Sequence, residues 1–108
     1  MTSWLESPLL TLSDVERFEA EMPLHDRLPG DSVYDVFVRA AEIHGNRIAL
    51  TMLMTGDEDE QPRRVSYAEL LELVRQTANL FKSLGSERPG VAFMLPTLIE
   101  THAVLWGA

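Results

Sequence analysis

A helix with a complete start signal constrains the fold of this chain most strongly. Ser66 and Glu69 form a capping-box pair, in which each side chain can accept a hydrogen bond from the other residue's backbone N–H. Gly85 follows some five turns later, and glycine often ends a helix in a left-handed conformation. Between them an apolar stripe recurs at helical spacing, at Leu70, Leu71, Val74, Ala78, Phe81 and Leu84. The sequence therefore predicts a long amphipathic helix that ends at Gly85.

Short apolar runs on both sides of this helix predict strands. Residues 48–54 predict a strand, the acidic stretch 55–62 a solvated hairpin tip, and 63–65 the partner strand. Residues 91–95, after the helix, are apolar at every position, as in a parallel strand that is covered on both faces. From residue 63 onward the order is strand, helix, strand, helix, which is typical of a β-α-β crossover with parallel strands.

The start of the chain predicts an arm that carries one short helix. Ser13 and Glu16 form a second capping-box pair, so we expect a helix over residues 14–22. We assign residues 1–30 to this N-terminal arm and residues 31–108 to one folded region, because prolines and a glycine separate the two.

A connector and another helix precede the first strand. Residues 23–30 contain two prolines and a glycine, which predict the connector. Ser32 is placed to cap the helix, and Asp35 puts negative charge in its first turn. We expect Gly45 to end this helix in a left-handed conformation. Its apolar face consists of Val33, Val36, Phe37, Ala40 and Ile43.

Charge and composition exclude several function classes. The 108 residues carry 9 Lys and Arg against 17 Asp and Glu, a net charge of −8, whereas nucleic-acid binding depends on clustered cations. The same balance disfavours docking on an anionic membrane surface. The sequence shows no signal peptide and no apolar run long enough to span a bilayer, and it contains no cysteine. We therefore expect a soluble cytoplasmic protein without disulfides.

The end of the chain is apolar on more than one side. A last helix is predicted from a Thr97 cap, and Glu100 is the only charged residue after position 89. Its apolar residues are Leu98, Ile99, Leu105 and Trp106. Because two strands cannot form a parallel sheet with covered faces, we expect an N-terminal fragment of a larger α/β domain. The apolar helix would then be covered by the remainder of the same chain or by a second copy in a homo-oligomer.

The segment Val65-Ser66-Tyr67-Ala68-Glu69-Leu70 resembles the first core motif of the adenylate-forming (AMP-binding) superfamily, whose usual form is Leu-Thr/Ser-Tyr-x-Glu-Leu. The order of elements fits as well, with Leu84-Gly85 ending a long helix and Leu95-Pro96 ending the next strand. The sequence has Thr97 where the family often has Asn. Within the superfamily, the chain is most similar to the acyl-CoA synthetases, or fatty-acid–CoA ligases.

The resemblance implies a ligase that uses ATP, Mg²⁺ and coenzyme A. A carboxylic acid and ATP give an acyl-adenylate, and the thiol of coenzyme A then forms the thioester. In the family, the phosphate loop, the nucleotide contacts and the catalytic lysine come later in the chain. The resemblance therefore places no catalytic, cofactor-binding or metal-binding residue in this segment. It implies a structural role for Ser66, Tyr67, Glu69 and Leu70, in a scaffold segment that is inactive by itself.

Two alternative functions stay open at this point. The chain fits a small acidic α/β interaction module without catalysis, whose apolar last helix a partner would cover. Asp31-Ser32-Val33 also resembles the attachment site of an acyl-carrier domain, in which Ser32 would carry phosphopantetheine. Carrier domains are all-helical, so the predicted strands disfavour this alternative.

The remaining chemistry-bearing residues favour ordinary structural roles. Lys82, the only lysine, lies near the predicted helix end, where a surface cation interacts well with the helix dipole. His25, His44 and His102 are scattered without metal-ligand spacing, and residues 57–60 lack the spacing of a calcium loop. The sequence therefore predicts no metal site.

Overall fold

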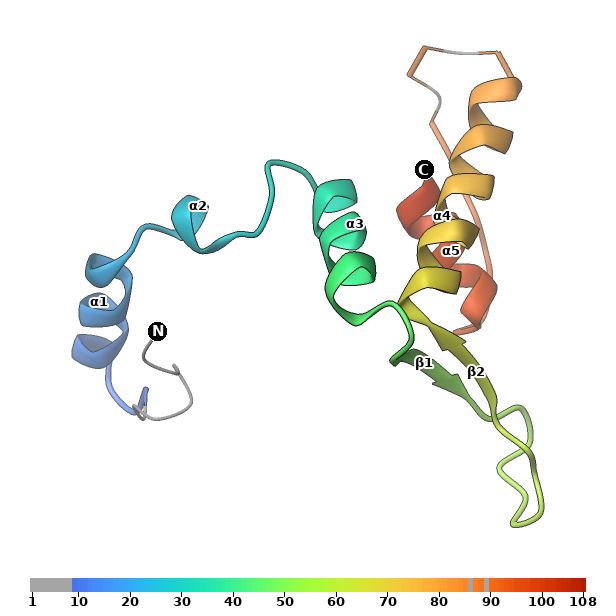
Figure 1. Cartoon of the computed structure of the whole chain (residues 1–108), viewed down its shortest axis with the longest axis horizontal. Helices are drawn as coiled ribbons and strands as arrows, with labels where there is room; N and C mark the ends of the chain where they lie inside the picture. The colour runs from blue at the N-terminus through green and yellow to red at the C-terminus, as the bar shows by residue number, and fades with distance from the viewer. Residues whose placement is uncertain (1–8, 86, 89) are drawn as a thin grey trace. The chain divides into compact units, whose positions relative to one another are not determined.

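The computed structural model describes residues 9–85, 87–88 and 90–108. The chain divides into two compact units, Met1–Asp31 and Ser32–Ala108. The elements, labelled in Figure 1, are α1 (Leu12–Glu21), α2 (Leu24–Arg27), α3 (Val33–His44), β1 (Ile48–Met52), β2 (Arg63–Ser66), α4 (Tyr67–Ser83) and α5 (Ile99–Gly107).

In the first unit, α1 begins two residues earlier than predicted. Thr11 is its N-cap: the Thr11 hydroxyl accepts from the Asp14 N–H at 3.2 Å, and Asp14 Oδ2 accepts from the Thr11 N–H at 3.0 Å. The predicted pairing of Ser13 with Glu16 is therefore wrong. The hydrogen bond from the Thr11 hydroxyl is the main cause that lowers the pKa of Asp14.

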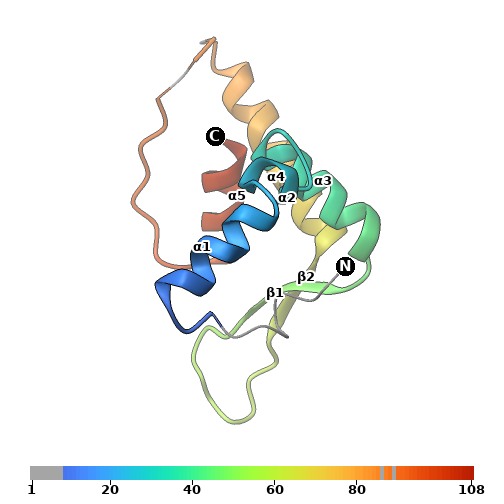
Figure 2. The ribbon, with the colours of Figure 1, turned by 90° about the vertical axis from the view of Figure 1, so that its left-hand side faces the viewer.

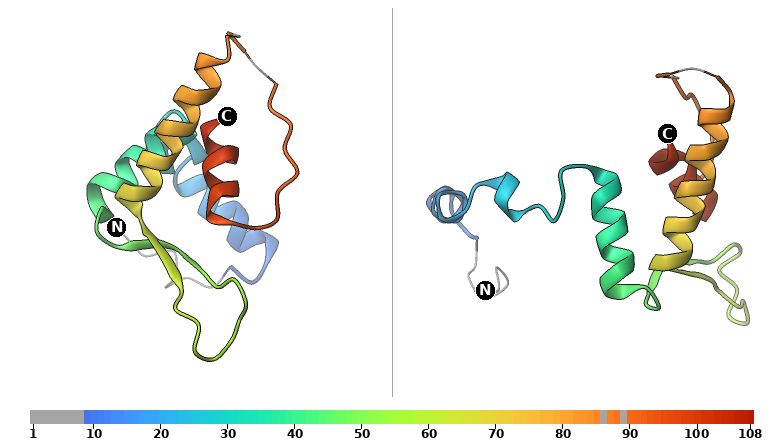
Figure 3. Two further views of the ribbon diagram at one scale, coloured as in Figure 1. Left: turned by 90° about the vertical axis from the view of Figure 1, so that its right-hand side faces the viewer. Right: turned by 45° about the horizontal axis from the view of Figure 1, so that its top comes forward.

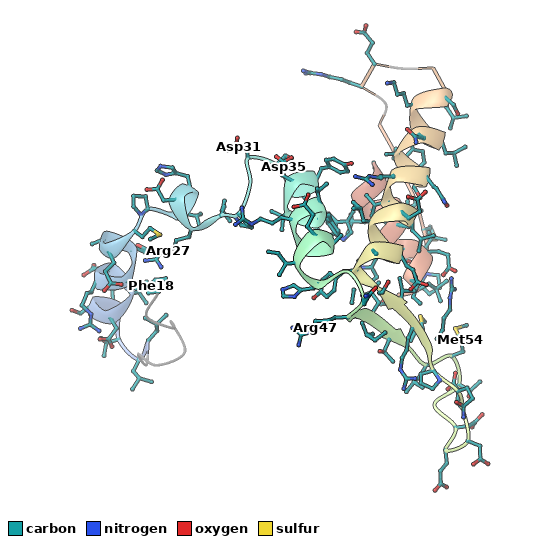
Figure 4. The ribbon with its side chains drawn as sticks, viewed as in Figure 1. Phe18, Arg27, Asp31, Asp35, Arg47 and Met54 are labelled. Carbon is teal, nitrogen blue, oxygen red and sulfur yellow. The ribbon has the colours of Figure 1, made fainter. Side chains whose placement is uncertain are left out.

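The predicted connector contains a short helix, α2, and its Arg27 side chain caps the C-terminal end of α1. Arg27 Nε donates to the carbonyl oxygen of Met22 at 2.8 Å, and its Nη2 donates to the carbonyl oxygen of Phe18. The guanidinium also lies 3.8 Å from the centre of the Phe18 ring. Both side chains are labelled in Figure 4. The last turn of α1 has no basic residue of its own, so Arg27 supplies the cation that its carbonyls favour.

In the second unit, α3 begins as predicted. The Ser32 hydroxyl accepts from the Asp35 N–H at 3.1 Å, and Asp35 accepts from the Ser32 N–H at 3.1 Å. The end of α3 differs from the prediction, because Gly45 has right-handed helical angles, φ −38° and ψ −48°. A contact with the start of α4, described below, takes the place of the left-handed cap.

The two strands form an antiparallel hairpin, as predicted. Leu50 pairs with Val65 and Met52 pairs with Arg63, with an irregularity between Ile48 and Leu50. The first strand ends at Met52, two residues before the predicted end at residue 54. The chain turns away there because the backbone N–H groups of residues 54–56 donate to the Glu60 carboxylate instead of continuing a ladder.

Helix α4 is the centre of the second unit, in contact with α3, α5 and both strands. Figure 3 shows α5 beside α4, and the views of Figures 2 and 3 show the hairpin loop extending away from both helices. The predicted end of the helix at Gly85 is confirmed, and Gly85 has a φ of +93°. The core consists of Val65, Leu70, Val74 and Ile99, each at most 6% exposed.

Residues 91–95 do not form the predicted strand. They run as an extended connection between α4 and α5, and Met94 is 98% exposed. Within the described part of the chain, the sheet consists of β1 and β2 alone, and they are antiparallel, so the parallel crossover is not formed. A strand exists only where a neighbouring strand pairs with its backbone, and the apolar pattern of 91–95 does not specify that neighbour.

The start of α5 also differs from the prediction. Leu98, and not Thr97, is the N-cap, and its N–H donates to the Thr101 hydroxyl at 3.3 Å. Thr101 in turn donates to the carbonyl oxygen of Pro96. The first eight residues of the predicted N-terminal arm, and residues 86 and 89, lie outside the described ranges.

Candidate functional site

The motif residues at the junction of β2 and α4 form a complete capping box. The Ser66 hydroxyl accepts from the Glu69 N–H at 3.2 Å, and Glu69 Oε2 accepts from the Ser66 N–H at 2.8 Å. The N–H and hydroxyl of Ser66 lower the pKa of Glu69, so its carboxylate stays ionised near the positive end of the helix dipole. The predicted pairing of these two residues is confirmed as geometry.

The next two N–H groups of α4 are satisfied by the turn that follows α3. Tyr67 N–H donates to the carbonyl oxygen of Arg47 at 3.0 Å, and Ala68 N–H donates to the carbonyl oxygen of Gly45 at 3.1 Å. A helix leaves its first four N–H groups without intrahelical partners, and such groups often hold phosphates or other anions. Here all four have protein partners. The start of α4 therefore connects this helix to β2 and to the turn after α3. None of its first four N–H groups is free to donate to a phosphate.

The side chains of the motif also make structural contacts. Leu70 is 6% exposed and belongs to the core with Val65 and Val74. The Tyr67 ring lies 5.7 Å from the imidazole of His44, centre to centre, at the end of α3. The motif thus holds α3, the hairpin and α4 together.

A groove lies beside β1. Its volume is about 220 Å³, and it lies between the strand and the start of α5. One wall consists of Leu50, Thr51, Met52 and Leu53, and the other of Thr97, Leu98, Ile99 and His102. We call this feature the β1 groove. Sequence reasoning missed it, because it depends on how α5 packs against the hairpin and no local pattern signals that packing.

The polar groups of the β1 groove do not form a catalytic constellation. His102 and the two threonines line it, and no hydrogen bond joins these side chains to one another among the described contacts. General acid–base or nucleophilic catalysis requires such groups within hydrogen-bond reach. Five of the eight residues that line the groove are apolar.

Other candidate residues lie apart from the motif. Lys82 is exposed in the last turn of α4, as predicted, and His25 lies 2.8 Å from the exposed Asp26. Ser32 is engaged as a helix cap, and the antiparallel hairpin that follows it is foreign to an all-helical carrier domain. Within the ranges that the structure describes, no three His, Asp or Glu side chains gather as metal ligands.

The acidic loop of the hairpin is organised by one of its own carboxylates. Glu60 accepts from the N–H groups of Met54, Thr55 and Gly56 and from the Thr55 hydroxyl, the longer of these bonds measuring 3.0–3.2 Å. These hydrogen bonds, that from the Met54 N–H foremost, lower the pKa of Glu60. The Glu60 carboxylate is thus the acceptor for the N–H groups of residues 54–56.

None of the described helices combines the length and the apolar character that crossing a membrane requires. No family model matches the sequence, and no solved structure matches it.

The chain is 38% identical over 98 residues to the marinolic acid–CoA ligase of Pseudoalteromonas sp. (strain SANK 73390). The match covers 90% of this chain and 15% of the relative, so the chain spans about one seventh of the length of that ligase. The resemblance to acyl-CoA ligases that the motif at residues 65–70 indicated is therefore confirmed: nearly the whole of this chain is similar to one segment of a larger acyl-CoA ligase.

Proposed function

We propose that this chain is the scaffold segment of an ATP-dependent acyl-CoA synthetase. The observation that carries the proposal is the 38% identity to an acyl-CoA ligase over 90% of the chain. The complete enzyme activates a carboxylic acid in two steps. A carboxylate oxygen attacks the α-phosphorus of ATP and pyrophosphate leaves, and the thiol sulfur of coenzyme A then attacks the acyl carbonyl and AMP leaves.

The segment itself contributes no catalytic group and no cofactor-binding residue to this reaction. The hydrogen bonds at the start of α4 support this part of the proposal, since the N–H groups of Ser66, Tyr67, Ala68 and Glu69 all have protein partners. ATP, Mg²⁺ and coenzyme A are accordingly bound by other parts of the enzyme, and the segment alone is inactive. Mg²⁺ would reduce the negative charge on the phosphates during the first step.

In the complete enzyme, residues 31–108 belong to the large adenylate-forming domain, and residues 91–95 join its parallel sheet. The exposure of this apolar run supports the idea, because Phe93, Met94 and Leu95 are 43%, 98% and 43% exposed. Burying them against a larger sheet is worth about 25 cal/mol per Å² of apolar surface. The enzyme works in the cytoplasm. The exposed residues Leu105 and Trp106 of α5 form the contact for a homo-oligomer if the rest of the domain leaves them uncovered.

The test is acid-dependent ATP–pyrophosphate exchange by the complete polypeptide, followed by detection of the acyl-CoA thioester. The panel includes marinolic acid, after the relative's substrate name, together with straight-chain fatty acids of several lengths. We expect exchange with at least one acid, thioester formation only when coenzyme A is added, and no exchange by residues 1–108 alone. Exchange by the short chain would contradict the scaffold role, and a complete polypeptide inactive with every acid would contradict the ligase assignment.

A further inference from the structure

The β1 groove follows the edge of the strand and not one of its faces. Successive side chains of a strand point to opposite faces of the sheet. Four consecutive residues, 50–53, nevertheless line the groove, which is the arrangement expected where a depression runs alongside a strand. The opposite wall is formed by residues 97–99 and His102 at the start of α5.

The edge of β1 is unpaired in this unit. The described sheet has two strands, so β1 pairs with β2 on one side and meets no strand on the other. An unpaired edge presents a row of backbone N–H and C=O groups that can accept another strand. A two-stranded sheet is only marginally stable, and a third strand adds to its stability.

The two strands differ in how their edges are protected. Proteins commonly guard edges that stay exposed with charged residues or proline. Strand β2 begins with Arg63 and Arg64, whereas β1 contains neither a charge nor a proline. The apolar run continues past β1 into Leu53 and Met54, which are 55% and 69% exposed. The edge of β1 thus resembles the edge of a strand that is covered in the complete protein.

We propose that the edge of β1 receives an extended apolar strand from the rest of the ligase polypeptide, and that alternate side chains of this strand fill the β1 groove. The inference depends on the proposed function, in which the chain is one segment of a longer enzyme. The matched segment makes up 15% of the related ligase, so a long stretch of that relative lies outside it, and the corresponding part of this enzyme would supply the strand. Backbone hydrogen bonds provide the affinity, and Leu50, Met52 and Ile99 provide an apolar floor.

Residue-resolved amide hydrogen exchange on the complete polypeptide tests this proposal. In an edge strand only alternate N–H groups are hydrogen-bonded, so slow and fast exchange alternate along it, whereas an internal strand exchanges slowly throughout. We expect every amide from residue 49 to 52 to exchange at least tenfold more slowly than the amides of the exposed residues 58 and 59. Alternating fast and slow exchange in β1 would overturn the proposal.

A pair of variants separates strand addition from general burial. Leu53→Lys places a charge in the groove, whereas Leu53→Met keeps an apolar side chain of similar size. We expect Leu53→Lys to speed exchange at residues 49–52 at least tenfold and Leu53→Met to leave it within about twofold. Equal exchange in both variants would overturn the proposal. Protection that grows with protein concentration would also overturn it, because a second copy would then be the occupant.

The same preparation distinguishes this inference from the proposed function. ATP–pyrophosphate exchange together with alternating exchange in β1 overturns the strand addition and leaves the ligase assignment intact. Continuous protection of β1 without ATP–pyrophosphate exchange for any acid overturns the ligase assignment and leaves the strand addition intact.

Discussion

The backbone N–H of Ala68 donates a 3.1 Å hydrogen bond to the carbonyl oxygen of Gly45, which ties the first turn of α4 to the end of α3. Gly45 has right-handed helical angles instead of the left-handed angles that are common at helix ends. A Cβ atom at this position would lie 2.8 Å from the carbonyl oxygen of Ala41, so a larger residue would force the turn to shift. The hydrogen bond thus joins two segments that are distant in the sequence.

The close approach of α5 to α4 predicts that Gly107→Ala destabilises the protein. A Cβ atom at Gly107 would lie 2.7 Å from Thr77 Cβ and 2.8 Å from its Cγ2. Overpacking of this kind typically costs about 1–3 kcal/mol of unfolding free energy. Urea denaturation measures the loss.

Gly90→Ala is the matched control for this substitution. No heavy atom lies within 4 Å of a Cβ atom built at Gly90, and its φ is outside the left-handed region. We expect its unfolding free energy to change by less than about 0.5 kcal/mol. Equal effects of the two substitutions would show that the helix contact is looser than the structure indicates.

The ion pair between Arg63 and Glu100 joins β2 to α5, and we predict a small, salt-sensitive coupling. Both side chains are 55% exposed, which limits the expected energy to about 0.2–1 kcal/mol in a double-mutant cycle with Arg63→Ala and Glu100→Ala. The hydrogen bond from Arg63 lowers the pKa of Glu100 below 4.5, so the coupling is complete above that pH. It is lost as the pH falls through the lowered pKa.

Arg64→Ala provides the control for the ion pair, since Arg64 is the neighbouring cation and has no hydrogen bond to Glu100 in the structure. We expect no measurable coupling between Arg64 and Glu100. A coupling that is unchanged in 1 M salt would mean that the pair is less exposed than described.

The hydrogen bonds of Glu60 predict a loop whose order depends on pH. Because they lower its pKa below 4.5, their stabilisation is complete above pH 4.5 and is lost as the pH falls through the lowered pKa. The amide proton shifts of Thr55 and Gly56 in NMR spectra should therefore titrate with a midpoint below 4.5.

Two variants make the test of this loop specific. Glu60→Gln should abolish the titration of the Thr55 and Gly56 amides and move their shifts toward random-coil values at pH 7. Glu58→Gln removes the same charge from a carboxylate that makes none of these hydrogen bonds, and it should leave both shifts in place. A midpoint that stays unchanged in Glu60→Gln would assign the titration to another group.

Features that depend on neighbouring residues in the sequence could be predicted. The Ser32 cap, the capping box of Ser66 and Glu69 and the helix end at Gly85 are local, and all three are present. The start of α1 was missed although the same kind of signal marks it. Asp14 acts here as the partner of Thr11, and the prediction considered only the Ser13–Glu16 pair.

Features that depend on distant segments could not be predicted. The apolar run at 91–95 was assigned to a strand from its composition, but a strand requires a neighbour that the pattern does not specify. The position of Gly45 predicts a left-handed cap, whereas Gly45 has right-handed angles and its carbonyl oxygen accepts from the Ala68 N–H. The β1 groove follows from the packing of α5 against the hairpin.

We propose that the motif at residues 65–70 connects structural elements and is not part of the nucleotide site. Ser66→Ala in the complete polypeptide tests it, because the substitution removes the hydroxyl that accepts from the Glu69 N–H. Loss of such a cap costs about 0.5–2 kcal/mol of unfolding free energy. Ser66→Thr, which keeps the hydroxyl, is the control and should retain most of the stability.

The decisive measurement is the KM for ATP in acid-dependent ATP–pyrophosphate exchange, determined together with the unfolding free energy of the same variant. The account predicts that Ser66→Ala lowers the unfolding free energy by about 0.5–2 kcal/mol and leaves the KM for ATP within about twofold of the parent. A large rise in the KM for ATP with unchanged stability would contradict it, and would place Ser66 in the nucleotide site.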